Sequence, residues 1–372
     1  MAESPGMSTL IRTPWRVGVL VTALLLALVS CSSGGGSRIP VAQMPGASSS
    51  ATPSTLLGKS AYLHPDGVYF GVSTYHAPAR ATTDAVTAAA DRHPTILEYF
   101  QRWDQEFDPA AVKSSYDQGA IPLLTWEPQA ASKDANQPAY SLQKIASGDF
   151  DSYIVRFAEA VRTQQRTVIL RFAHEMNGDW YPWSEKNSGN RPGDYVKAWR
   201  HVHDLFSAVG ATNVIWLWSP NVLRGAPGVD LASLYPGDQY VDWMGVDAYG
   251  FGEKTASEVL DSTARILYRI SDKPLLISET GAEPGAEQAG WTASLFRWIK
   301  QNPRTIGFVW FQHSEDEGGL HDYRFDINPA TKSAFRHGLD SLELRDWPVP
   351  TVAATPSSSA TPLTSAAPAE GR

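Results

Sequence analysis

Residues 167–183 read TVILRFAHEMNGDWYPW, an aliphatic and β-branched run that ends in a cluster of polar and aromatic side chains. Residues 274–281 read PLLISETG, and this second apolar run ends in a glutamate followed by two small residues. Short runs of this composition are typical of buried β-strands. Each segment therefore predicts a strand whose C-terminal end carries a carboxyl group, Glu175 in the first and Glu279 in the second.

Six further runs of the same kind occur along the chain and bring the expected number of strands to eight, at 68–74, 95–99, 121–125, 167–172, 214–218, 243–247, 274–278 and 306–310. Between them lie segments with apolar residues three and four apart, which predict helices, for example at 150–164, 195–209, 257–270 and 291–301. This alternation predicts an α/β fold, a closed (β/α)₈ barrel (TIM barrel). An open doubly wound sheet would require a glycine-rich phosphate turn that the sequence lacks.

Composition and charge narrow the class of protein. The chain has 372 residues, of which 42% are apolar and 19% charged, as expected for one large globular domain. Its formal net charge of -8 argues against nucleic acid as a partner, because proteins that follow phosphates carry basic patches. Aromatic residues make up 11% of the chain, and their flat faces can either stack on sugar rings or fill a core. A neutral partner is favoured.

The N-terminal segment predicts export. Arg12 and Arg16 precede a short apolar run, 17–29, which has the form of a secretory signal. The run ends just before Cys31, the single cysteine of the chain, in a pattern that resembles a bacterial lipobox. We expect residues 1–30 to be a lipoprotein signal peptide and 31–60 a disordered tether with Cys31 lipidated. An ordinary signal peptide is the alternative.

The remaining chain is expected to form one catalytic domain, 61–347, followed by a disordered tail rich in Ala, Pro, Ser and Thr, 348–372. On a parallel barrel the functional side chains gather at the C-terminal ends of the strands. Polar and aromatic residues follow every predicted strand at this point: Tyr75, His76, Gln101, Arg102, Asp104, Trp126, Glu127, His174, Glu175, Asn221, Tyr249, Glu279, Gln312 and His313.

The segment from Arg171 to Trp183 resembles the acid/base signature of glycoside hydrolase family 26, and 277–281 resembles its nucleophile strand. In overall layout the resemblance covers about 67–345. It implies a retaining glycoside hydrolase in which Glu175 protonates the glycosidic oxygen and Glu279 attacks the anomeric carbon. Retention then requires the two carboxyl groups to lie about 5–5.5 Å apart.

The resemblance also implies roles for neighbouring side chains. His174 is expected to hydrogen-bond the substrate or the nucleophile, and Tyr249 to hydrogen-bond the nucleophile. Trp310 would form the floor under the reacting sugar, and Trp180 would line the cleft. Trp126, like Trp183, is interpreted as a sugar contact or as core packing, and Arg171 is expected to point into the barrel and orient the carboxylates, with a buried structural ion pair as the alternative.

Two other classes of function stay open. A metal-dependent barrel hydrolase would take a His-x-His pair from its first strand, where this chain offers only Tyr75 and His76. A non-catalytic sugar-binding lipoprotein would be expected to have lost one of the two glutamates. We therefore expect no metal and no cofactor, although an acidic loop after the eighth strand could contact calcium or substrate, at Asp316, Glu317, Asp322 and Asp326.

The implied substrate is a β-linked polysaccharide, most often β-1,4-mannan, with mixed-linkage β-glucan and β-1,3-xylan as alternatives within the family. The expected location is the extracellular face of a bacterial cell membrane, reached only through the lipid anchor. We expect a monomer.

Overall fold

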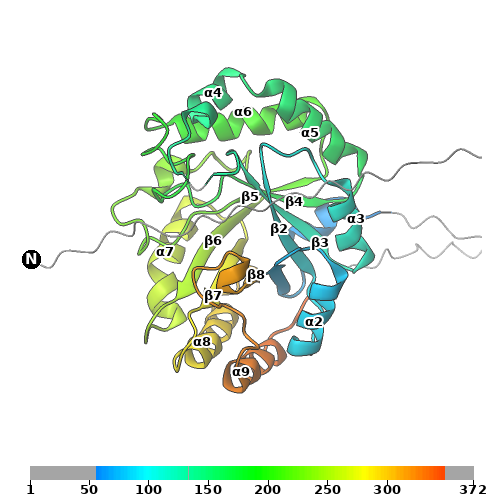
Figure 1. Ribbon diagram of the computed structural model, residues 1–372, viewed down its shortest axis with the longest axis vertical. Helices are drawn as coiled ribbons and strands as arrows, with labels where there is room; N and C mark the ends of the chain where they lie inside the picture. The colour runs from blue at the N-terminus through cyan, green and yellow to red at the C-terminus, as the bar shows by residue number, and fades with distance from the viewer. Residues whose placement is uncertain (1–55, 133, 348–372) are drawn as a thin grey trace, which may run out of the picture. The chain divides into compact units, whose positions relative to one another are not determined.

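The computed structural model describes residues 56–132 and 134–347 (Figure 1). The predicted signal peptide, Cys31, the tether up to residue 55 and the C-terminal tail lie outside the described residues. Within the described part of the chain, no helix is long and apolar enough to cross a membrane.

Eight parallel strands form a closed barrel in which each strand pairs with its neighbours in sequence and the last pairs with the first. The predicted (β/α)₈ barrel is therefore confirmed. The strands are β1 (Tyr69–Thr74), β2 (Ile96–Arg102), β3 (Ile121–Glu127), β4 (Val168–Phe172), β5 (Val214–Trp218), β6 (Trp243–Gly250), β7 (Leu275–Ala282) and β8 (Thr305–Gln312).

Helices surround the barrel on its outer side (Figure 1). Those found in the described residues are α1 (Ser60–Leu63), α2 (Arg80–Ala90), α3 (Pro109–Asp117), α4 (Leu142–Ser147), α5 (Asp151–Thr163), α6 (Asp194–Ala208), α7 (Ala256–Ile270), α8 (Gln288–Gln301) and α9 (Pro329–Asp340). Three short 3₁₀ helices, η1 (Pro138–Tyr140), η2 (Leu231–Leu234) and η3 (Glu315–Glu317), lie in the connections.

The connection from β5 to β6 departs from the expected alternation, because η2 is the helical segment described there. Proline and glycine recur along this stretch, at Pro220, Gly225, Pro227, Gly228, Pro236 and Gly237. Proline removes a backbone donor and glycine loses the most entropy on ordering, so a long helix is unfavourable here.

Side chains alternate between the two faces of each strand, and this decides which residues reach the interior of the barrel. One buried cluster fills the N-terminal part of the interior and includes Ile96, Ile169, Trp243, Leu276 and Val309. A larger cluster lies between the strands and the helices. Toward the C-terminal ends the inward positions become polar, at Glu98, Thr125, Arg171, Ser219, Asp247 and Ser278, all 0% exposed.

A β-bulge interrupts the pairing of β6 with β7. Val246 pairs with Ile277, but the next residue, Asp247, pairs with Glu279, so that Ser278 is the extra residue of β7. A bulge lets two successive side chains turn to the same face. Ser278 hydrogen-bonds the buried Asp247 at 2.7 Å, and Glu279 bonds the guanidinium inside the barrel. Regular alternation after Ser278 would have turned Glu279 outward.

Candidate active site

A cavity of about 620 Å³ lies at the C-terminal ends of β4 to β8, and both Glu175 and Glu279 line it. The two glutamates thus lie in one pocket, as the sequence predicts. The remainder of the lining is a mixture of aromatic and polar side chains, chiefly Trp180, Asn221, Tyr249, Phe251, Phe311 and Tyr323.

Glu175 lies just after β4, where the backbone leaves the barrel in an unusual conformation. Its φ is 50°, and that of Ala173 is 46°, in the left-handed region that residues with a Cβ rarely adopt. The amide of Glu175 donates to the carbonyl of Ser219 at 2.7 Å, which ties this turn to β5. Strained backbone of this kind concentrates at functional sites, where it aims a side chain.

The carboxyl group of Glu175 is nearly buried and accepts two side-chain hydrogen bonds. The indole Nε1 of Trp180 donates to Oε2 at 2.6 Å, and the amide of Asn221 donates to Oε1. Burial, with the nearby charge of Glu279 as a second cause, raises the pKa of Glu175 to about 7. This group can therefore hold a proton near neutral pH.

Glu279 is held by two donors of different kinds. Tyr249 Oη donates to Oε2 at 2.7 Å, and Arg171 Nη1 donates to Oε1 at 2.6 Å. Burial and the charge of Glu279 raise the pKa of Tyr249 well above its ordinary value, so the phenol keeps its proton. Both contacts match the roles expected of Tyr249 and Arg171, and both donors favour a charged carboxylate.

His174 does not reach the nucleophile. Its ring is 1% exposed, and Nε2 pairs with the hydroxyl of Tyr181 at 3.1 Å. Burial lowers the pKa of His174 well below its ordinary value, with the charge of Arg171 as a second cause. The histidine is a neutral ring that supports Tyr181. Tyr181 lines the cavity and His174 does not, so the predicted direct contact of His174 is wrong.

Of the tryptophans predicted to contact sugar, Trp180 is placed in the cavity and is 37% exposed. Trp310 and Trp126 are 0% exposed and lie in the outer cluster between strands and helices. Trp310 Nε1 donates to the Tyr323 carbonyl at 2.9 Å, and Trp126 stacks on Phe157. The predicted sugar contact of Trp310 is therefore wrong, and of the two interpretations of Trp126 the structure supports core packing.

The reason for this error is the alternation of the strands. Val309 points into the barrel, so the next residue, Trp310, points outward and Phe311 points inward. Phe311 lines the cavity at the place expected for Trp310. Trp126 follows the inward Thr125 in the same way. Trp183 is likewise buried, with its Nε1 donating to the carbonyl of His174 at 2.5 Å.

Several site residues lay outside the predicted set. Asn221 was visible at the end of its strand, but nothing in the sequence indicated that its amide reaches Glu175. Glu98 and Asp247 both bind Arg171 inside the barrel, Glu98 at 3.1 Å from Nη1 and Asp247 on Nη2. An inward carboxylate near the C-terminal end of a predicted strand is a signal that could have found them, because such a group requires a partner.

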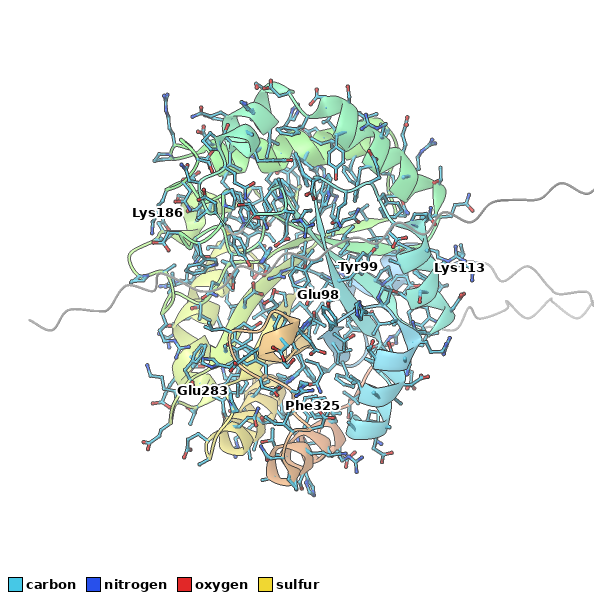
Figure 2. All side chains as sticks on the ribbon, viewed as in Figure 1. Glu98, Tyr99, Lys113, Lys186, Glu283 and Phe325 are labelled. Carbon is cyan, nitrogen blue, oxygen red and sulfur yellow. The ribbon has the colours of Figure 1, made fainter. Side chains whose placement is uncertain are left out.

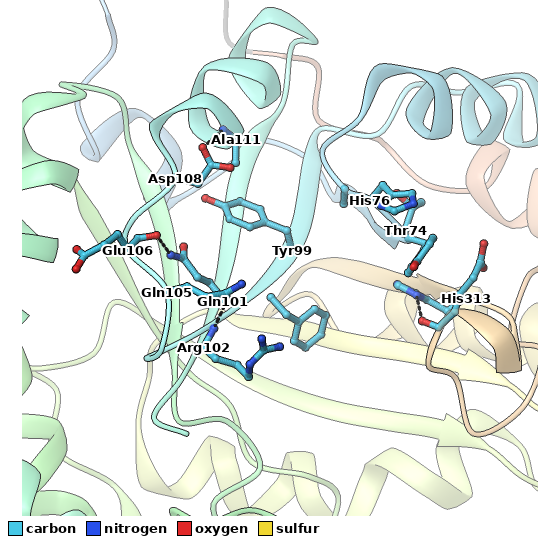
Figure 3. Close-up of a pocket in the computed structure, with 14 residues that line it drawn as sticks. Thr74, His76, Tyr99, Gln101, Arg102, Gln105, Glu106, Asp108, Ala111 and His313 are labelled. Carbon is cyan, nitrogen blue, oxygen red and sulfur yellow. Dashed lines mark hydrogen bonds between the residues drawn. The ribbon is translucent and has the colours of Figure 1, made fainter. Parts of the chain in front are cut away.

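A second cavity of about 560 Å³ lies beside the first, over the ends of β1 and β2 (Figure 3). Figure 3 shows Tyr99, Gln101 and Arg102 on one side and Thr74, His76 and His313 on the other. Phe100 lines this cavity and packs edge-on against Phe311, which lines the first one. An aromatic pair therefore stands between the two cavities.

Within 56–132 and 134–347, no three His, Cys, Asp or Glu residues are arranged to hold a metal ion. In the acidic loop after β8, Asp322 pairs with Arg324 at 2.6 Å and Asp326 accepts from Gln312 at 2.7 Å. Glu317 accepts from the amide of Ser314 at 3.0 Å. These three carboxylates are thus engaged within the protein.

A closed parallel barrel that carries two carboxyl groups in one cavity at its C-terminal face has the architecture of the barrel glycoside hydrolases. Residues 84–278, just over half of the chain, match the profile of glycosyl hydrolase family 26. The match includes Glu175 and ends one residue before Glu279. The chain belongs to glycosyl hydrolase family 26.

Relatives of three activities are similar to this chain. Endoglucanase H of Acetivibrio thermocellus is 30% identical over 79% of the chain and 33% of its own length. A mannan endo-1,4-β-mannosidase of Bacillus subtilis is 28% identical over 45% of the chain and 42% of its own length. A β-1,3-xylanase of Alcaligenes sp is 27% identical over 54% of the chain and 48% of its own length. The chain thus matches less than half the length of each.

Among solved structures, a family 26 β-mannanase from Bacteroides ovatus superposes with a TM-score of 0.61 at 19% identity, covering 76% of this chain and 90% of the other. At this identity the likeness concerns the fold.

Proposed function

We propose that the protein is a retaining glycoside hydrolase that cleaves a β-linked polysaccharide by double displacement. The main support for this proposal is that two glutamates lie in one cavity and have different neighbours. Glu175 is buried with a raised pKa of about 7, and Glu279 is bound by a guanidinium and a phenol. Glycosidic cleavage needs an acid and a carboxylate that differ in this way.

In the first step, Glu175 donates its proton to the glycosidic oxygen while Glu279 attacks the anomeric carbon and displaces the leaving sugar. Arg171 and Tyr249 orient the attacking carboxylate through their two hydrogen bonds. In the second step, Glu175, now ionised, removes a proton from water, which attacks the same carbon and frees Glu279. The anomeric configuration is inverted twice and so retained.

The first candidate for the substrate is β-1,4-mannan, with mixed-linkage β-glucan and β-1,3-xylan as alternatives. The names of the similar proteins, which include mannanases, an endoglucanase and a β-1,3-xylanase, support this range. These polymers differ in hydroxyl orientation and linkage. Discrimination between them depends on polar groups around the cavity, because an unmatched buried donor or acceptor is costly.

A polymeric substrate is supported by the second cavity. It opens on the same face of the barrel and presents two exposed aromatic side chains, Tyr75 and Phe100, together with Arg102 and Glu106. Aromatic faces beside polar groups suit sugar rings. Tyr75→Ala should lower kcat/KM on long oligosaccharides by roughly tenfold, as expected for one lost stacking contact of about 1.4 kcal/mol, and leave a disaccharide glycoside unaffected. Equal losses on both substrates would exclude this role.

We also propose export and lipid anchoring at Cys31, supported by the apolar run and the residues before that cysteine. The barrel would then act outside the cell membrane on surface or imported glycans. Replacing Cys31 with Ala should move the protein from the membrane fraction to the soluble one.

The test of the proposed activity is a panel of mannan, mixed-linkage β-glucan and β-1,3-xylan with purified protein, with product anomers followed by NMR. We expect turnover of one polymer with β-products formed first. Glu279→Ala should abolish turnover and keep binding. A protein that binds a glycan without hydrolysing it would be a sugar-binding lipoprotein, and products that are α at first would exclude double displacement.

A further inference from the structure

The guanidinium of Arg171 is surrounded by more negative groups than it can neutralise. Nη1 contacts Glu98 at 3.1 Å and Glu279 at 2.6 Å, and Nη2 contacts Asp247. The side chains of Arg171, Glu98 and Asp247 are 0% exposed, and that of Glu279 is 9% exposed. One positive charge thus faces three carboxyl groups, of which those of Glu98 and Asp247 are closed to solvent. Full ionisation would leave two uncompensated charges there, which costs several kcal/mol or more.

The three carboxyl groups differ in the number and placement of their hydrogen-bond donors. Asp247 accepts from Arg171 and from two hydroxyls, those of Ser219 at 3.0 Å and Ser278 at 2.7 Å. Glu279 accepts from Arg171 and Tyr249, one on each oxygen.

Glu98 has two donors, as Glu279 has, but both of them bind the same oxygen. Its Oε1 accepts from Thr125 Oγ1 at 2.6 Å and from Arg171, whereas its Oε2 is buried and has no hydrogen-bond partner among the described residues. Figure 2 labels Glu98 near the middle of the barrel, while Lys113 and Lys186 lie at the outside. A buried carboxylate oxygen without a donor is far less favourable than the neutral acid.

We propose that Glu98 is a positioning residue that holds a proton and so leaves the charge of Arg171 to Glu279 and Asp247. This inference rests on the proposed role of Glu279 as nucleophile. If Glu98 were ionised, it would compete for Nη1 and repel the neighbouring carboxylate of Glu279. The protonated form keeps Oε1 as an acceptor that holds Arg171 and Thr125 in place, without adding charge.

The direction of the pKa of Glu98 agrees with this geometry. Burial raises it to about 8, against the opposing effect of Arg171. Asp247 of β6 and Glu279 of β7 share the guanidinium with it, and burial also raises the pKa of Asp247, opposed by Arg171 and by the hydrogen bond from Ser278. Thr125 of β3 and Ser73 of β1 lie beside it, and Ser73 pairs with His313 of β8 at 3.0 Å. Burial lowers the pKa of His313, so no second cation is supplied from that side.

The first test is spectroscopic and needs no substrate. In an infrared difference spectrum at pH 6, wild type minus Glu98→Gln, we expect the C=O stretch of a protonated carboxylic acid. Glu175→Gln in both proteins removes one other carboxyl group with a raised pKa, and those of Glu127 and Asp247, also raised, are present in both proteins and cancel in the difference. In wild type the band should fade as the pH rises through about 8. Absence of this band at pH 6 would overturn the proposal, whether or not the protein hydrolyses a glycan.

The second test is kinetic and separates positioning from folding. We would measure the burst of dinitrophenolate from 2,4-dinitrophenyl β-mannobioside, a leaving group that needs no proton, in the Glu175→Gln background. Glu98→Ala should slow the burst by tenfold or more, and Glu98→Gln, which resembles the protonated acid, should recover most of that loss. We expect the burst rate to fall as the pH rises through about 8, and this fall should be absent in Glu98→Gln.

Loss of the burst in Glu98→Gln as severe as in Glu98→Ala, with both proteins folded by circular dichroism, would show that a charge is needed at this position. That result would overturn the proposal. If Glu175→Gln with Glu98 intact gave no burst on this glycoside, the proposed mannan specificity would be contradicted, and the infrared band would then decide on Glu98 alone.

Discussion

Glu175 and Glu279 carry the same functional group, and their neighbours give them different tasks. Glu175 accepts hydrogen bonds from an indole and an amide in a nearly closed site, whereas Glu279 accepts from a cation. Burial favours the protonated form of Glu175, and its two neutral donors oppose that effect only in part, whereas a guanidinium strongly favours the carboxylate. The division of labour between the two glutamates thus follows from three side chains around them.

The raised pKa of Glu175 sets the alkaline limit of activity. Only the protonated form can serve as acid, so kcat/KM on an unactivated oligosaccharide should fall about tenfold per pH unit above pH 7. Glu175→Ala should lower kcat by roughly 10²–10⁴. On a substrate with a dinitrophenyl leaving group, which needs no proton, Glu175→Ala should lower kcat much less. The decline of kcat/KM above pH 7 should be absent from its pH profile. A decline near pH 7 that persists in Glu175→Ala would mean that another group titrates there.

Tyr249 offers a second test at the scale of one hydrogen bond. Tyr249→Phe removes the donor to Glu279 Oε2 and leaves the ring in place. A hydrogen bond to a charged group contributes about 1.5–3 kcal/mol, which corresponds to a loss of roughly 10–150-fold in kcat/KM. The rate of trapping of Glu279 by a 2-fluoro glycoside should fall in parallel. An unchanged trapping rate would mean that the phenol does not assist the nucleophile.

At the scale of elements, the sequence was sufficient for the strands and their order. Runs of β-branched and aliphatic residues are visible without any knowledge of partners, and β5 was predicted at its observed bounds, 214–218. The C-terminal extensions of β2, β3, β6, β7 and β8 were not predicted, because polar residues and glycines interrupt the apolar runs there. The bulge at Ser278 depends on pairing with β6, which a single strand does not encode.

The sequence also does not show which face of a strand a side chain occupies, and this explains the wrong prediction for Trp310. Trp310 and Phe311 are neighbours on β8, and only the face of the strand decides which of them lines the cavity, whereas Trp180 lies in the loop after β4. Trp310→Ala should lower the free energy of unfolding by about 3–5 kcal/mol, as expected for a fully buried ring, with KM unchanged in folded protein. Trp180→Ala should change stability by less than about 1 kcal/mol and lower kcat/KM. Both variants would be measured by denaturant titration and by kinetics. A loss of activity without a loss of stability in Trp310→Ala would place Trp310 in the site.

At the scale of the whole molecule, the site is a set of buried acids inside a stable barrel, and this set opposes folding at high pH. The pKa values of Glu98, Glu127 and Glu175 are raised to about 8, 7 and 7, with burial as the leading cause in each case. The folded protein therefore binds protons more tightly than the unfolded chain does. Its stability is full below about pH 4.5 as far as these groups are concerned, and declines as the pH rises through 7 to 8.

Removing one of these charges should therefore stabilise the protein only at high pH. At pH 9, Glu175→Gln should raise Tm, and the free energy of unfolding should increase by at most on the order of 3 kcal/mol. At pH 4.5, Tm should be nearly unchanged. Glu159→Gln on α5 is the matched control, because it removes the same charge from an exposed position. Calorimetry at the two pH values would distinguish burial from net charge. Equal gains in both variants would mean that general repulsion in an acidic protein, not desolvation of the catalytic acid, limits its stability.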